Sequence, residues 1–254
     1  YQSPDNSRGI IMSNYFSKYP AIDYFFGDEG LSNKVENIAV FSDVIAQIRD
    51  ATTSYQDYYI LPDERPDQVS FKIYGTTDFH WTFYLMNNHL RERGWPLSNE
   101  KLYQYAVDNY TERVIDTQTV LTDKYAIGNQ VESLTNFATG NVAHRNLDLG
   151  QVWITGGNGV DFTTGEVVRT TTTIVDEIVV IRAATKRLNA VHHYENADGE
   201  YVDIDPTVAR PAIYTEKTWL DELTRQNDEL KQIKVIRPGI IGEVVRSFSS
   251  ALLT

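Results

Sequence analysis

The chain has 254 residues, of which 41% are hydrophobic, so it is long and apolar enough to bury a core divided among two or three units. Its 35 acidic residues outnumber its 23 basic ones, and the formal net charge of −12 argues against a protein that neutralises nucleic-acid phosphates. The absence of cysteine excludes disulfides, thiol nucleophiles and cysteine-rich zinc sites, and it favours a bacterial cytoplasmic or virion protein.

The N-terminal part of the chain, residues 1–36, is predicted to be an extended arm rich in aromatic residues. Its densest stretch, "SNYFSKYPAIDYFFGDEG" (13–30), has neither a helical nor an alternating apolar period. Such an arm either folds back on its own core or lies across another subunit. The second alternative predicts a partner interface at six aromatic residues: Tyr15, Phe16, Tyr19, Tyr24, Phe25 and Phe26. Met12 has the sequence context of a natural start, so the origin of residues 1–11 stays open.

Residues 37–114 are predicted to form a helix, a compact βαα unit (58–98) and an exit helix. The first helix, 37–51, carries one apolar stripe made of Val40, Phe41, Val44, Ile45 and Ile48. The exit helix, 98–114, opens at Ser98 and carries an apolar face made of Leu102, Tyr105, Ala106 and Tyr110.

The compact unit begins with "YYIL", which is typical of a short strand, and two prolines end this strand. A first helix is predicted from Pro66 to Gly75, because proline is tolerated in the first turn and glycine adopts the positive φ of a C-terminal cap. A second helix is predicted to begin after Asp78, which would be its N-cap, and to reach Asn88, with Trp81 on the buried stripe.

From 115 to 212 the composition shifts to glycine, threonine, asparagine and valine, and short runs that favour strands alternate with glycine turns. This segment is predicted to be a β-rich insert. Within it, Asp198 and Gly199 predict a hairpin, because this pair supplies the positive φ that a tight turn needs between two alternating strands.

The C-terminal part, 213–254, is predicted to contain two amphipathic helices separated by a short strand (234–236). The first helix is expected to be about 18 residues, or ~27 Å, long, and to carry Trp219, Leu220, Leu223, Leu230 and Ile233 on one arc. Asp221 and Arg225 are predicted to pair on its outer face. The shorter final helix directs five residues inward: Val244, Val245, Phe248, Ala251 and Leu252.

These two helices differ in predicted length, so packing them together would leave apolar surface exposed. Either the protein's own other parts or a partner helix is expected to cover this surface. The second alternative predicts a partner interface at Trp219, Leu223, Leu230, Val244, Val245, Phe248 and Leu252.

The sequence marks no catalytic, cofactor or metal site. The five histidines lack the spacing of metal ligands, and the adjacent pair, His192 and His193, is predicted to point to opposite faces of a strand. No nucleophile elbow or phosphate-binding loop occurs, and no run approaches the ~20 apolar residues of a membrane-spanning helix. The loop 194–199 imitates part of a calcium loop but lacks the closing glutamate. A hydrolase with an unmarked acidic pair stays open as a third interpretation.

The stretch "YYILPDERPDQVSFKIYGTTDFHWTFYLMNN" (58–88) resembles a LysM module, whose pattern is an aromatic strand, a turn, a helix ending in "YG" and a second helix ending in "N". Two departures concern the places that build the glycan groove of that module. The usual turn glycine and threonine are replaced by residues 63–66, and no second strand is evident in "HLRERGWPLSNEKL". Both departures weaken the expectation that this unit binds a glycan.

A longer series of motifs is similar to the LysM-containing baseplate wedge subunit of contractile-tailed bacteriophages. The series contains, in order, "RP" at 65–66, "YG" at 74–75, Trp81, "GW" at 94–95 and the helix–strand junction 227–236. The resemblance implies an α+β structural protein without catalytic activity or cofactors. It also implies a place in the virion tail baseplate, which is assembled in the bacterial host cytoplasm. The β-rich insert has no counterpart in this pattern.

The resemblance further implies one copy per wedge of a six-fold baseplate, clamping the helical core of the wedge and helping to join neighbouring wedges. The expected partners are therefore other baseplate wedge proteins, and neither nucleic acid nor a membrane. The alternative is a LysM-type protein that binds peptidoglycan or chitin. The altered turn at 63–66 and the missing second strand favour the first interpretation.

Overall fold

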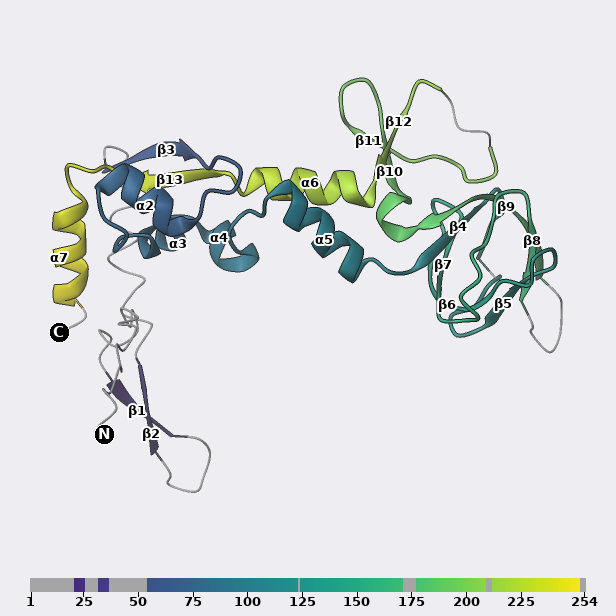
Figure 1. Ribbon diagram of the computed structural model, residues 1–254, viewed down its shortest axis with the longest axis horizontal. Helices are drawn as coiled ribbons and strands as arrows, with labels where there is room; N and C mark the ends of the chain where they lie inside the picture. The colour runs from purple at the N-terminus through teal and green to yellow at the C-terminus, as the bar shows by residue number, and fades with distance from the viewer. Residues whose placement is uncertain are drawn as a thin grey trace, which may run out of the picture. The chain divides into compact units, whose positions relative to one another are not determined.

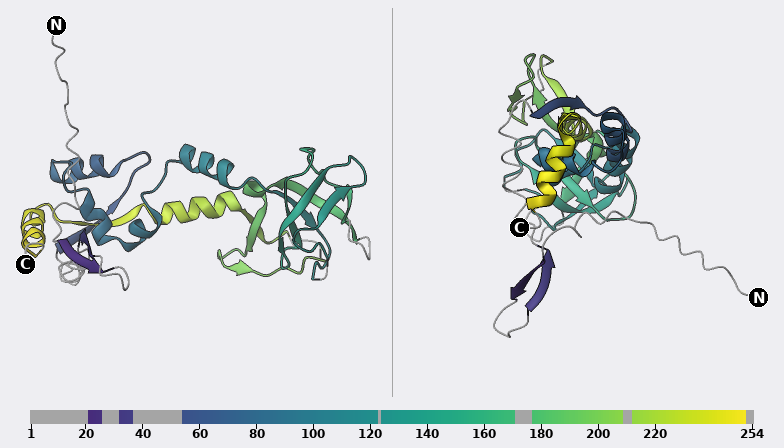
Figure 2. Two further views of the ribbon diagram at one scale, coloured as in Figure 1. Left: turned by 90° about the horizontal axis from the view of Figure 1, so that it is seen from below. Right: turned by 90° about the vertical axis from the view of Figure 1, so that its left-hand side faces the viewer.

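The computed structural model describes residues 21–25, 32–36, 54–122, 124–170, 177–208 and 212–251 (Figures 1 and 2). These residues contain both helices and strands, which confirms the predicted α+β class. The chain divides into two compact units: unit 1 comprises residues 1–96 and 228–254, and unit 2 comprises residues 97–227. Within the described ranges, no helix has both the length and the apolarity that crossing a membrane requires.

Unit 1 is built on a two-stranded antiparallel sheet in which β3 (Tyr55–Tyr59) pairs with β13 (Gln232–Ile236). Figure 1 shows the two strands side by side, although they are far apart in the sequence. The second strand that was not evident after residue 88 is thus supplied by the C-terminal part of the chain. The core beneath the sheet consists of Ile60, Val69, Phe83, Leu90, Leu230, Ile233 and Val235.

Three helices follow β3: α2 (Pro66–Tyr74), α3 (Trp81–Met86) and α4 (Asn88–Arg93). The predicted limits of α2 are confirmed, and Gly75 caps it with a φ of 74°. The predicted second helix is wrong at both ends. It begins at Trp81, two residues later than an N-cap at Asp78 predicts, because His80 occupies the N-cap position. At the other end, extended Asn87 separates α3 from α4.

Trp81 is half-buried rather than part of the central core of unit 1. Its ring packs against the ring of Phe248, with 5.1 Å between centroids, and Phe248 belongs to α7 (Ile241–Ala251). The final helix therefore covers Trp81.

Asn87 completes the outer edge of β13 with its side chain. Its amide Nδ2 donates hydrogen bonds to the carbonyls of Phe83 and Lys234, each at 2.8 Å, and its Oδ1 accepts from the Lys234 N–H at 2.8 Å. The N–H and C=O of one residue point to the same side of an antiparallel strand, so the side chain of Asn87 lies on the edge of β13 that does not face β3. Asn87 is 4% exposed, whereas Asn88 is exposed.

Unit 2 contains a closed barrel of six strands in the order β4-β7-β6-β5-β8-β9. All neighbouring strands are antiparallel. The strands are β4 (Arg113–Thr117), β5 (Gln130–Ser133), β6 (Thr139–Asn146), β7 (Gln151–Thr155), β8 (Val167–Thr170) and β9 (Glu177–Lys186). Alternate side chains fill the interior, including Ile115, Val131, Ile154 and Ile181.

Beside the barrel, β10 (Val191–Glu195) lies between β11 (Tyr201–Val202) and β12 (Thr215–Thr218) in a three-stranded sheet. The predicted hairpin at Asp198 and Gly199 is confirmed as β10–β11, with Gly199 at a φ of 80°. The predicted exit helix is α5 (Asn99–Asn109), and the Ser98 side chain caps it by accepting from the Lys101 N–H. Tyr105, which was predicted to be inward, is 47% exposed.

The helix predicted after residue 218 is shorter than expected: α6 (Trp219–Glu229) has 11 residues, the same number as α7. Leu230 and Ile233 therefore lie beyond the helix, and the argument from unequal helix lengths fails. The predicted Asp221–Arg225 pair is also wrong. Asp221 accepts from the Thr218 N–H at 2.8 Å at the start of the helix, and Arg225 pairs with Glu222 at 2.7 Å.

The N-terminal arm contains a regular element that was not predicted. Strand β1 (Ala21–Phe25) pairs with β2 (Ser32–Glu36) as an antiparallel hairpin, so the backbone of β1 has hydrogen-bond partners within the chain. The predicted helix 37–51 lies outside the described residues.

We expect Asn87→Ala to lower the free energy of unfolding by about 2–4 kcal/mol, because it removes three hydrogen bonds and leaves buried backbone groups unpaired. Asn88→Ala is the matched control, since its side chain is exposed, and it should cost no more than about 0.5 kcal/mol. Urea unfolding of the two variants measures the difference. Equal stabilities would show that the Asn87 amide does not hold β13.

Candidate functional site

The turn between β3 and α2 is closed by the side chain of Glu64. Its carboxylate accepts hydrogen bonds from the Leu61 N–H at 2.9 Å, the Tyr58 hydroxyl at 3.0 Å and the Lys72 ammonium at 3.0 Å. Although burial acts in the opposite direction, these hydrogen bonds hold the pKa of Glu64 below its usual value. Glu64 is therefore a charged anchor at the centre of the turn.

The "GW" motif is fixed to the same turn. The indole N–H of Trp95 donates to the Glu64 carbonyl at 2.7 Å, and the Trp95 ring packs against Phe83 and Tyr84 with centroid distances of 6.0 and 6.1 Å. Gly94 precedes it with a φ of 87°, a conformation that favours glycine. Trp95 and Glu64 thus both make hydrogen bonds that stabilise the turn itself.

A pocket of about 440 Å³ lies in unit 1 between the end of α3 and the sheet. Its walls are formed by Tyr55, Asp57, Met86, Asn87, Asn88, His89, Glu229, Gln232, Ile233 and Lys234. Tyr55 is the one aromatic residue in this lining, and the Lys234 ammonium lies 4.6 Å from the centroid of its ring. A sugar that stacked on this face of Tyr55 would have to displace the ammonium.

The predicted arm interface falls mostly outside the described part of the chain. Tyr15, Phe16, Tyr19 and Phe26 are outside it altogether. Tyr24 and Phe25 belong to strand β1, whose backbone is described, whereas their side chains are not. The interface at these residues stays a prediction.

The predicted C-terminal interface residues face the protein's own interior to different degrees. Leu230 (6% exposed) and Phe248 (4%) are buried inside unit 1 rather than presented to a partner. Val244 and Val245 are half-buried against the cluster of Met86, Ile236 and Ile241. Trp219 and Leu223 on α6 are also half-buried, and Leu252 lies outside the described residues. Among the described residues of this set, Leu230 and Phe248 are thus the two that the chain itself buries, and the partner interface stays a prediction.

Three large side chains that were not predicted are exposed close to the Glu64 turn: Tyr59 (56%), Leu61 (48%) and Phe71 (62%). We name these three residues the turn surface. Tyr59 and Leu61 flank the buried Ile60, so they point away from the core in extended chain, and Phe71 adjoins Lys72, which binds Glu64. The alternation around Ile60 was the sequence signal that could have identified Tyr59 and Leu61.

In unit 2, Arg187 is enclosed by three aromatic rings. Its guanidinium carbon lies 4.1 Å from the ring centroid of Trp153, 4.4 Å from Trp219 and 4.5 Å from Tyr110. The same guanidinium pairs with Glu112 at 3.2 Å. These rings come from strand β7, the start of α6 and the end of α5, so Arg187 joins the barrel to both helices. No local sequence pattern indicates this cluster, because its members are far apart in the chain.

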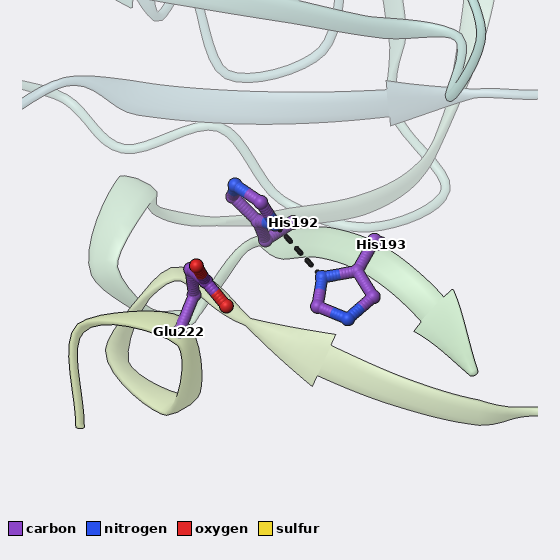
Figure 3. A group of neighbouring side chains, drawn as sticks. All are labelled: His192, His193 and Glu222. Carbon is purple, nitrogen blue, oxygen red and sulfur yellow. Dashed lines mark hydrogen bonds between the residues drawn. The ribbon is translucent and has the colours of Figure 1, made fainter. Parts of the chain in front are cut away.

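The cluster continues to a pair of histidines on β10 (Figure 3). The ring of His192 lies edge-on to that of Trp219, with 4.4 Å between centroids. Its Nδ1 lies 2.8 Å from Nδ1 of His193. The prediction that these two rings point to opposite faces is wrong, because a register irregularity between Val191 and His193 interrupts the alternation of the strand. Burial, followed by the neighbouring His193, lowers the pKa of His192 and favours its neutral form.

The comparisons with known proteins give one family. Residues 16–133, just under half of the chain, match the family described as base plate wedge protein 53. None of the curated proteins matches the chain. The family match places the protein in the tail baseplate of a phage virion and supports a structural role there. A structural role of this kind suggests a protein without catalytic activity that associates with other baseplate proteins.

We expect Arg187→Met to lower the free energy of unfolding by about 3 kcal/mol, because it removes three ring contacts and leaves Glu112 without its cation. Arg169→Met is the control: its ion pair with Glu132 is more exposed, and it should cost at most about 1 kcal/mol. Thermal and urea unfolding compare the two. A similar cost for both variants would mean that the rings add nothing to the ion pair.

Proposed function

We propose that this protein is a component of the baseplate wedge that clamps the wedge core and helps to join neighbouring wedges in a six-fold assembly. The observation that carries the proposal is the match of residues 16–133 to base plate wedge protein 53. The expected partners are other wedge proteins, and the contacts are expected to be between protein surfaces.

Unit 1 is, on this proposal, a LysM-like unit that serves protein contact. The order β3, α2, α3 and β13, with the two strands paired, supports this interpretation. The second strand arrives after unit 2, which explains why it could not be found next to α4 in the sequence.

The turn surface is the wedge-contact surface that we propose on unit 1. Tyr59, Leu61 and Phe71 expose large apolar side chains on elements that the Glu64 carboxylate holds together. Aromatic and aliphatic anchors on a rigid support contribute strongly to protein association, because little conformational entropy is lost on binding. The arm aromatics Tyr15 to Phe26 are the second surface, and we assign to them the contact with a neighbouring wedge.

The double variant Leu61→Ser/Phe71→Ser should fold normally but associate with the purified wedge proteins at least about tenfold more weakly, because it removes two exposed anchors. Ile127→Ser/Ile178→Ser is the matched control, since these barrel residues are 65% and 55% exposed. Analytical ultracentrifugation measures association, and circular dichroism verifies folding. Wild-type association of the first variant would refute the turn surface.

The alternative function is glycan binding, which the pocket beside Tyr55 favours. The closed Glu64 turn and the ammonium over the Tyr55 ring argue against it. We therefore expect chitin and peptidoglycan fragments to bind no better than with a millimolar dissociation constant, about −4 kcal/mol. Calorimetric titration tests this expectation. A micromolar constant that weakens in Tyr55→Ala would establish the alternative.

A further inference from the structure

His192 and His193 are adjacent in sequence, yet one ring nitrogen of each lies close to the other. Their Nδ1 atoms are 2.8 Å apart, and the register irregularity of β10 at this position places the rings together. Irregularities of this kind re-aim a side chain that regular alternation would turn away, and they are frequent at functional sites. A carboxylate oxygen of Glu222 on α6 lies within 4.8 Å of the histidine ligand atoms (Figure 3).

Glu195 orients the ring of His193. Its Oε1 lies 3.1 Å from Nε2 of that ring. Because a carboxylate oxygen can only accept, Nε2 carries the hydrogen and donates a hydrogen bond to Glu195. In the neutral imidazole, Nδ1 then has its lone pair directed at His192. Metal-binding histidines usually donate their other ring N–H to a carboxylate in this way, because the hydrogen bond fixes both the tautomer and the orientation of the ring.

Glu222 is held in place by its own helix. Arg225 donates to Oε2 at 2.8 Å and to Oε1 at 2.7 Å, and Gln226 donates to Oε1 at 2.7 Å. These three bonds use Oε1 twice and Oε2 once, and each carboxylate oxygen offers about two lone-pair directions. The hydrogen bonds from Arg225 are the largest influence on the pKa of this carboxyl and lower it. They outweigh burial, which acts in the opposite direction, so the pKa is about 2. Glu222 is therefore an ionised, fixed oxygen donor.

We propose that His192, His193 and Glu222 form a binding site for a divalent transition-metal ion of the zinc class. Two neutral imidazoles and one carboxylate suit Zn²⁺, Co²⁺ or Ni²⁺, whereas Ca²⁺ and Mg²⁺ prefer sites made of oxygen ligands. Ligands about 2.0–2.1 Å from a tetrahedral ion are about 3.3 Å apart, so the two nitrogens would separate by about 0.5 Å on binding. Water would complete the four ligands.

The bound ion would have a structural role inside unit 2. It would link β10 to α6 close to Trp219, whose ring contacts both His192 and Arg187. The ion would thus reinforce the same connection that the Arg187 cluster makes. Without metal, the two Nδ1 atoms share one proton in an N–H···N hydrogen bond.

The test uses the full chain, freed of metal with a chelator and titrated with Zn²⁺ in a calorimeter and with Co²⁺ in an absorption spectrometer. We expect one ion per chain, the visible bands of tetrahedral Co²⁺ and a higher melting temperature with Zn²⁺. His193→Gln and His192→Gln should abolish these effects. Glu195→Gln, which removes only the support of His193, should weaken binding about 10- to 100-fold.

His144→Gln is the control, because His144 is exposed and lies on a different strand, and it should bind zinc as the wild type does. Circular dichroism of every metal-free variant establishes that it folds. Absence of zinc binding by the wild-type chain would overturn the proposal regardless of how the variants fold. Unchanged zinc binding in His193→Gln would place the ion elsewhere and also overturn the proposal.

Discussion

The architecture depends on a side-chain bridge where the chain passes between its two units. The Asn227 amide accepts from the Leu97 N–H at 2.8 Å and donates to the Leu97 carbonyl at 2.9 Å, so it pairs with a backbone 130 residues away. The bridge holds together the two ends of unit 2. Closing a long loop carries an entropic cost that grows only slowly with loop length, so a large unit can be accommodated if its ends are fixed. With the ends fixed, β13 returns next to β3, and the sheet of unit 1 can form.

Asn87 acts in the same way within unit 1, where its side-chain amide pairs with both backbone groups of Lys234. Both asparagines are buried, at 4% and 5% exposure, and each satisfies the N–H and C=O of one backbone residue. Tyr74 acts similarly: its hydroxyl donates to the Ile236 carbonyl at 2.9 Å, and burial raises its pKa to about 12. Side chains of this kind stabilise unit 1 by pairing with buried backbone groups.

Local signals in the sequence were sufficient wherever the deciding interaction was local. Pro66 and Gly75 bound α2 correctly, and Gly199 identified a hairpin, because proline fixes its own φ and glycine permits the positive φ that a helix end or a tight turn requires. Periodicity failed where a tertiary partner decides. Leu230 and Ile233 continue the helical period of α6, but pairing with β3 draws this segment into a strand. The closed barrel and the Arg187 cluster depend on contacts between distant residues, and the histidine pair depends on a register irregularity in the pairing of β10 with β12, so the sequence carries no local signal for any of the three.

The barrel is not an insert separate from the segment that matches the family, because two of its strands belong to that segment. The family match ends at residue 133, at the end of β5, and so includes β4 and β5. These two strands do not pair with each other: β4 pairs with β7 and β9, and β5 pairs with β6 and β8, all beyond the match. An isolated strand cannot satisfy its backbone hydrogen bonds. The matched segment therefore requires the strands that follow it, and the region that looked like a variable addition completes a structure that the family segment begins.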